Sequence, residues 1–142
     1  MTEQGSHPQL CQTVLDCVDA RELAEFYRVL LGFRYRPGDE PPASGRPDER
    51  GADWLVLRAP DGGRQLAFQR VDRLARPTWP EGPVPQQMHL DLTVPSVAEL
   101  RAQHERVLAL GGRLLSDRSD DAEEPLFVYA DPAGHPFCVF VA

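Results

Sequence analysis

Two ionisable side chains in one short segment, His89 and Asp91, are the first candidates for chemistry in this sequence. They belong to Gln87–Val94, whose alternation of polar and apolar residues predicts a strand, so both side chains point to the same face. A histidine with a neighbouring carboxylate can act as a general base or help to hold an ion. The alternative is the ordinary solvated face of an antiparallel sheet, and the pair by itself does not decide between the two.

The overall composition argues against several classes of partner. The net charge is −7 and all 15 basic residues are arginine. We therefore expect no nucleic-acid partner, which would need a basic stripe, and no lysine is present for a Schiff base or a P-loop. The sequence has no apolar run near the ~20 residues that span a bilayer, and its start, Met1–Gln9, lacks the pattern of a signal peptide. Cys11, Cys17 and Cys138 have neither metal-site nor disulfide spacing, so we expect free thiols. Together these features predict a cytoplasmic protein with no membrane partner.

The segment around His89 is the second copy of a unit that first occurs near the N-terminus. Leu10–Val18 predicts a strand, and a helix follows from Asp19 as N-cap, with Glu22 as its capping-box partner, to Gly32. The same pattern recurs 77 positions later, where Gln12 aligns with His89, Leu15 with Leu92, Asp19 with Ser96, Glu22 with Glu99 and Leu23 with Leu100. A repeat that includes both the caps and the apolar positions indicates a duplicated structural unit.

Further strands complete each unit. The second helix is expected to run to about Leu110, before two glycines, with Val97, Leu100, Val107 and Leu108 on its apolar side. The other predicted strands are Phe33–Arg36, Trp54–Arg58, Gln65–Val71, Arg113–Ser116, Leu126–Ala130 and Phe137–Val141. The sequence thus predicts one α+β domain over residues 1–142, with module one at about 9–71, a proline-rich connector at 72–85 and module two at about 86–142.

The alternation of each first strand separates a face for the helix from an open face. Leu15 and Cys17 should pack under the first helix, and Leu90, Leu92 and Val94 under the second. If the open face is a pocket rather than a plain surface, its polar contacts are Gln12, Asp16, Gln87, His89 and Asp91, and its apolar walls are Trp54, Phe68 or Tyr129.

The combined pattern resembles the vicinal oxygen chelate superfamily, the group of glyoxalases, bleomycin-resistance proteins and extradiol dioxygenases, and most resembles actinobacterial glyoxalase-like domains. The residues that carry the resemblance are Leu15–Asp19, Phe26-Tyr27, Leu31-Gly32, Trp54–Leu57, Pro85–Leu92 and Asp131–Pro136. The resemblance implies two βαβββ modules that form a cupped, mostly antiparallel sheet, often within a homodimer.

The resemblance also implies a position for a metal. Catalytic members of the superfamily hold one divalent ion with four side chains, and these positions fall here on Gln12, Ala67, His89 and Cys138. Two positions that usually offer glutamate are therefore occupied by alanine and cysteine. Because the carboxylates that neutralise a divalent ion are missing, we expect no metal cofactor, with one divalent ion as the alternative.

Three functions follow from these observations. The first is binding of a small molecule in the cup without turnover, as in the bleomycin-resistance members. The second is an enzyme, either a metal-dependent lyase or dioxygenase or a metal-free enzyme in which His89 is the base, oriented by Asp91 or Asp16. The third is a protein-interaction module that uses loops 37–52 or 72–85. Whether the protein is an enzyme stays open at this point.

Overall fold

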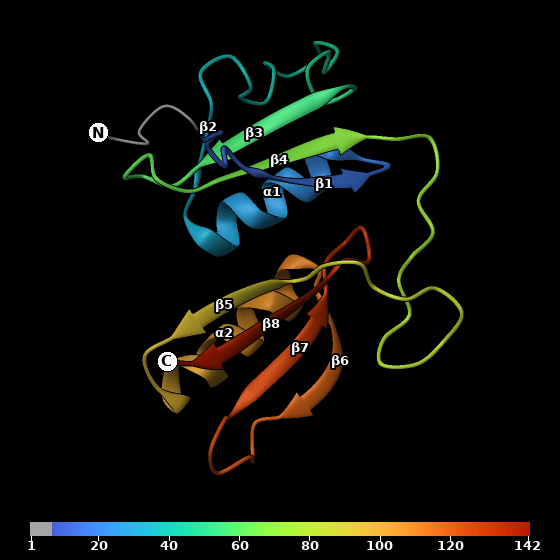
Figure 1. Cartoon of the computed structure of the whole chain (residues 1–142). Coiled ribbons are helices and arrows are strands. Elements are labelled where there is room, and N and C mark those ends of the chain that lie inside the picture. Colours follow the sequence, from blue (N-terminus) through green and yellow to red (C-terminus); the bar gives the residue numbers. More distant parts are fainter. Residues whose placement is uncertain (1–6) are drawn as a thin grey trace.

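The computed structural model describes residues 7–142, so most of the polar start at Met1–Gln9 lies outside the described residues. The order of elements is strand, helix and three strands, given twice (Figure 1). The elements are β1 (Thr13–Cys17), α1 (Ala20–Leu31), β2 (Arg34–Tyr35), β3 (Trp54–Arg58), β4 (Gln65–Arg70), β5 (Leu90–Val94), α2 (Val97–Leu110), β6 (Arg113–Arg118), β7 (Leu126–Ala130) and β8 (Pro136–Val141). No helix among these is long and apolar enough to cross a membrane.

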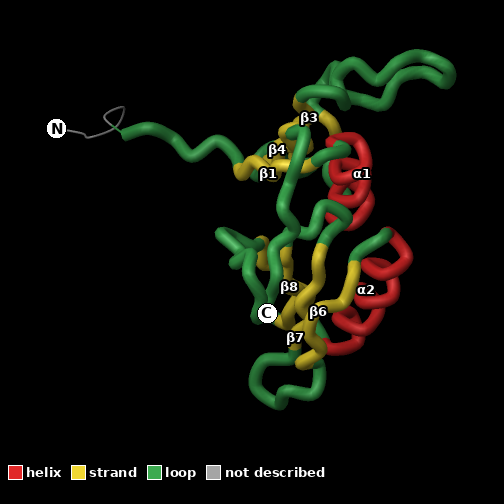
Figure 2. The backbone as a smooth tube through the Cα atoms, turned by 90° about the vertical axis from the view of Figure 1, so that its right-hand side faces the viewer, coloured by secondary structure: helices red, strands yellow, loops and turns green. Residues whose placement is uncertain are grey.

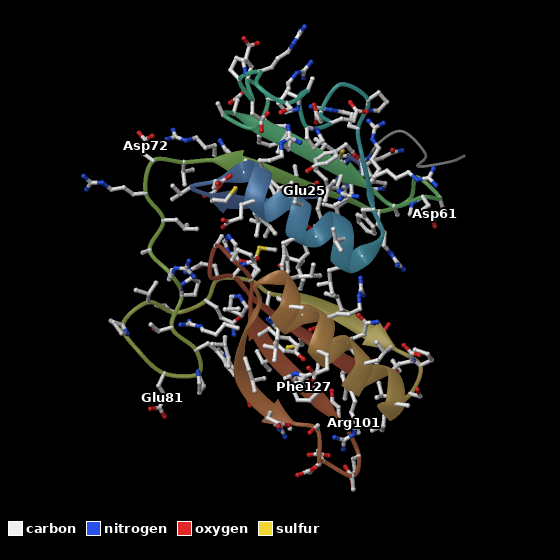
Figure 3. All side chains as sticks on the ribbon, turned by 180° about the vertical axis from the view of Figure 1, so that it is seen from behind. Glu25, Asp61, Asp72, Glu81, Arg101 and Phe127 are labelled. Carbon is white, nitrogen blue, oxygen red and sulfur yellow. The ribbon has the colours of Figure 1, made fainter. Side chains whose placement is uncertain are left out.

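The strands form two four-stranded mixed sheets, in the orders β1-β4-β3-β2 and β5-β8-β7-β6. In each sheet the first strand pairs in parallel with the last, and the other pairs are antiparallel. Figure 2 shows both helices on the same side of the molecule, and Figure 3, which views it from behind, shows them in front of the sheets. The predicted α+β fold with two βαβββ modules is confirmed, with β1 and β5 as edge strands of separate hydrogen-bonded sheets.

The helix ends agree with the predicted caps. The Asp19 carboxylate accepts a hydrogen bond from the Glu22 amide at 3.0 Å, and the Ser96 hydroxyl accepts one from the Glu99 amide at 3.1 Å. Gly32 ends α1 with φ 70°, a left-handed conformation that suits a glycine. The first strands of both modules are shorter than predicted, because β1 and β5 start where their ladders with β4 and β8 start.

The core lies between the helices and the two sheets. Leu15 and Cys17 are buried, as the alternation predicts, while Asp16 between them is exposed. Phe26 of α1 contacts Phe137 of the other module, with ring centroids 5.9 Å apart. The buried stripe of α2 consists of Leu100 and Val107 and is narrower than expected, since Val97 and Leu108 are 41% and 42% exposed.

Two of the expected pocket walls are wrong. Phe68 and Tyr129 are fully buried on the helix side of their sheets, where Phe68 stacks against Tyr27. The reason is the alternation of β4, in which Ala67 takes the opposite face from Phe68. Neither aromatic side chain can therefore line the open face of a sheet.

The two modules are joined by polar contacts near the turn between β7 and β8. The Tyr27 hydroxyl on α1 donates to Asp131 Oδ2 at 2.7 Å, and both side chains are buried. His135 Nε2 lies 2.7 Å from the backbone oxygen of Asp16 in β1. At the far end of α1, Arg106 Nη2 of α2 donates to the carbonyl of Val29 at 2.9 Å, where a cation complements the C-terminal end of the helix dipole.

The loop between β2 and β3 is exposed but anchored. Its Asp39 is fully buried, and its carboxylate accepts from the Val56 amide at 2.9 Å and pairs with Arg36 at 3.0 Å. Arg21 of α1 donates two hydrogen bonds, of 2.7 and 2.8 Å, to the carboxylate of Asp48. These contacts fix the two ends of a segment that the sequence predicts only as a surface loop.

Candidate ligand-binding cleft

A cleft of about 850 Å³ lies between the modules, along β5 and beside the start of β1. Its apolar lining comes from the end of α1 and from both sheets, and includes Leu30, Leu31, Phe33, Leu66, Leu92 and Val139. Polar and charged side chains make up nearly half of the lining and come from both modules: Gln12, Thr13, Arg64, Gln65, Asp91, Thr93, Gln103 and Arg106. Its volume lies within the range of sites for small organic molecules.

The position of the cleft follows from the contacts between the modules. Within residues 7–142, β1 and β5 are edge strands without a strand partner on their outer sides, so no backbone ladder joins the two sheets in this part of the chain. The turn after β7 reaches β1 through the contact of His135 with Asp16, near the end of that strand. The cleft lies at the other end of β1, where Gln12 and Thr13 line it.

The structure divides the predicted contact residues into separate groups. Gln12 and Asp91 line the same cleft, one from each module. Asp16 and Trp54 both lie opposite Gln69 in the sheet register, so they form a row across the open face of the first module. Gln87 is exposed before β5 and does not line the cleft.

His89 does not itself line the cleft but contacts Asp91, which does. Its Nε2 lies 3.2 Å from Asp91 Oδ1, and the two side chains are 43% and 56% exposed. The alternation of the extended chain places them on one face, as predicted, although His89 stands one residue before the first residue of β5. A polar pair is thus present at the edge of the cleft, within reach of solvent.

Cys138 is the third member of this group. The parallel register of β5 and β8 places it directly opposite Asp91. One donor atom from each of His89, Asp91 and Cys138 lies within 4.8 Å of the other two, and in residues 7–142 this is the one such group of histidine, cysteine and acidic side chains. Burial, followed by the negative charge of Asp91, raises the pKa of the Cys138 thiol, which disfavours the free thiolate.

The four metal positions expected from the resemblance do not form a site of that kind. Ala67 is fully buried and has no side-chain donor, so the first module offers at most Gln12. Asp91 brings a carboxylate to the group, but from a position outside that set of four. The sequence predicts Asp91 only as a partner that orients His89, and Cys138 as a free thiol. The register of β5 with β8 is the signal that brings the two residues together.

The comparisons with known proteins agree with this fold. Residues 12–140 match the family described as "Glyoxalase-like domain". The protein belongs to this glyoxalase-like domain family. No curated protein matches the chain.

Several solved structures resemble this glyoxalase-like protein at low sequence identity. A glyoxalase/bleomycin resistance protein/dioxygenase family enzyme from Burkholderia phytofirmans has a TM-score of 0.67 at 14% identity, covering 94% of this chain and 98% of its own. A fosfomycin resistance protein from Mesorhizobium loti has a TM-score of 0.64 at 15% identity, covering 96% and 93%. Lactoylglutathione lyase from Agrobacterium tumefaciens has a TM-score of 0.60 at 19% identity, covering 96% and 95%. These similarities establish the shared fold and not a shared activity.

Proposed function

We propose that this glyoxalase-like protein binds a small organic molecule in the cleft between its two modules, without the four-ligand metal site of the catalytic members. The observation that carries the proposal is the cleft itself, of about 850 Å³, with lining from both modules. Ligand pockets commonly have volumes of roughly 300–1,000 Å³. The absence of any donor at Ala67 supports a function that does not need that metal site.

The lining indicates what kind of molecule fits. Leu30, Phe33 and Leu92 offer apolar contacts, which favour a ligand with an aliphatic or aromatic body. Asp91 and Gln12 offer acceptors at two sides of the same space, so a ligand with a donor group gains orientation from them.

The test is a thermal-shift screen of a library of small organic molecules, made on three proteins. Thr93 is exposed and lines the cleft, so Thr93→Trp places an indole ring in that space. Gln69→Trp places the same ring on the open face of the first sheet, outside the cleft, and is the matched control.

A compound at 100 times its Kd should raise the Tm of the unmodified protein by roughly 5–10 °C. The shift should be retained in Gln69→Trp and lost in Thr93→Trp. Compounds that shift all three proteins equally, or a library in which nothing binds, would contradict the proposal.

An enzymatic reaction in the same cleft is the second candidate, and the 3.2 Å contact between His89 and Asp91 favours it. In this case His89 is the general base and Asp91 orients its ring. His89→Ala should then abolish turnover of a bound compound while its Kd changes little. Turnover that survives this substitution would exclude His89 as the base.

The homodimer implied by the family resemblance and the cytoplasmic location stay predictions. Light scattering after gel filtration measures the first, and fractionation of the source cells measures the second.

A further inference from the structure

We propose that His89, Asp91 and Cys138 form a site for one divalent cation of borderline softness, with Zn²⁺ as the ion that their donor atoms favour, held by the second module alone. The site differs from the one expected for the family because it takes no ligand from the first module. It keeps His89 and Cys138 from the four positions that the resemblance implies and adds the carboxylate of Asp91, which is not among those four.

The backbone brings the three side chains together. Asp91 of β5 and Cys138 of β8 are directly opposite in a parallel register, and His89 precedes Asp91 by two residues. The two strands belong to one sheet, so the distance between them does not depend on how the modules are placed. The site therefore has a rigid base, with His89 and Asp91 free to adjust because both are about half exposed.

The distances are close to those of a coordinated ion. With bonds of about 2.0–2.3 Å, the donor atoms of a tetrahedral zinc site lie roughly 3.3–3.8 Å apart. His89 Nε2 and Asp91 Oδ1 are already 3.2 Å apart, and no separation in the group exceeds 4.8 Å. The widest separation must close by roughly 1 Å, which a small rotation of an exposed side chain provides.

The donor types select the ion. An imidazole nitrogen, a carboxylate oxygen and a thiolate sulfur are all ordinary ligands of zinc, and three protein ligands leave the fourth position for water or another molecule. Mg²⁺ and Ca²⁺ prefer sites built only from oxygen, so this set disfavours them. When Nε2 of His89 is bound to zinc, it has no free lone pair to accept a proton. The zinc site and the enzyme with His89 as its base are therefore alternatives, and the zinc titration distinguishes them.

The experiment uses the full chain without a histidine tag, freed of metal and titrated with Zn²⁺ against a chromophoric chelator. We expect one ion per chain. Removing an outer partner of a metal ligand typically weakens binding 10–100-fold, so loss of a ligand in Cys138→Ser or His89→Ala should weaken it by more than roughly 100-fold. Co²⁺ in place of zinc should give a thiolate charge-transfer absorption, which Cys138→Ser should abolish.

Matched variants control for other causes. Cys11 is an exposed free cysteine, and Cys11→Ser should leave the stoichiometry, the affinity and the Co²⁺ spectrum unchanged. Asp91→Asn changes an exposed side chain and should weaken zinc without altering the circular dichroism or the Tm of the metal-free protein. The zinc titration uses no cleft ligand, so a failed screen for cleft ligands does not affect this test.

The inference is overturned if Cys138→Ser binds zinc as the unmodified protein does. It is equally overturned if the Co²⁺ spectrum has no thiolate absorption, or if Cys11→Ser removes binding to the same extent as Cys138→Ser.

Discussion

Replacing Tyr27 by phenylalanine removes one hydroxyl group from the buried contact between the modules. That hydroxyl donates to Asp131 Oδ2 at 2.7 Å, while Asp131 Oδ1 accepts from the amides of Ala133 and His135 at 2.9 and 3.0 Å. The ring itself is retained, so its stacking on Phe68 is unchanged. The substitution therefore isolates one hydrogen bond and leaves one buried carboxylate oxygen without its partner.

The expected loss depends on the charge of Asp131. A hydrogen bond to a charged group contributes about 1.5–3 kcal/mol, and one between neutral groups about 0.5–1.5 kcal/mol. Burial raises the pKa of Asp131, whereas the Tyr27 hydroxyl, the charge of His135 and the two amides oppose this rise. Above the folded pKa of Asp131 the carboxylate is charged, and there Tyr27→Phe should lower the free energy of unfolding by about 1.5–3 kcal/mol.

The raised pKa of Asp131 makes the stability of the fold depend on pH. A carboxyl whose pKa is raised in the fold binds more protons folded than unfolded, so its contribution to stability falls as pH rises from about 3.9, the unfolded value, through the folded pKa. Without the hydroxyl, the pKa of Asp131 should rise further. The loss caused by Tyr27→Phe should therefore be larger at pH 7 than at pH 4.

Urea unfolding at both pH values measures the effect, with Asp131→Asn as the control that carries no charge at any pH. In the Asp131→Asn background, Tyr27→Phe should cost about 0.5–1.5 kcal/mol at both pH values. A cost below 0.5 kcal/mol at pH 7 in the original background, or a cost that does not fall at pH 4, would refute the reasoning.

Three further substitutions test other parts of the fold by the change in the free energy of unfolding. Asp39→Ala leaves the Val56 amide unpaired in the interior and should cost about 2–3 kcal/mol, and an effect within 0.5 kcal/mol would mean that the loop is not anchored there. Gly112→Ala would place a Cβ in steric overlap with Val107 Cγ1 and should cost about 1–3 kcal/mol, whereas Gly45→Ala has open space but φ 84° and serves as the comparison for backbone strain without crowding. Tyr129→Phe removes the 2.7 Å contact of its hydroxyl with His104 Nδ1 and should cost about 0.5–1.5 kcal/mol, a value that an unchanged urea midpoint would contradict.

The parts of the fold that depend on neighbouring residues could be predicted from the sequence. Asp19, Ser96 and Gly32 act within one turn of their helices, so the caps and ends of α1 and α2 agree with the prediction. The alternation of β1 likewise separates buried Leu15 from exposed Asp16. The same alternation places Phe68 and Tyr129 on the helix-facing sides of β4 and β7, so neither forms a pocket wall.

The cleft could not be predicted in the same way. Its shape depends on how two modules pack, and the contacts that join them link residues far apart in the chain, such as Tyr27 and Asp131 at a separation of 104 positions. No sequence pattern within a single helix or strand indicates that Tyr27 and Asp131 form a contact. The group of His89, Asp91 and Cys138 is an intermediate case, because it requires only the register of β5 against β8.

Chemical-shift mapping of backbone amides with the compound that binds most tightly in the thermal-shift screen tests the central claim most directly. The account predicts saturable changes on both sides of the cleft, at Gln12 and Thr13 in the first module and at Asp91–Val94 in the second. Changes confined to one module, or centred on the row of Asp16, Gln69 and Trp54 on the open face, would contradict a ligand site between the modules.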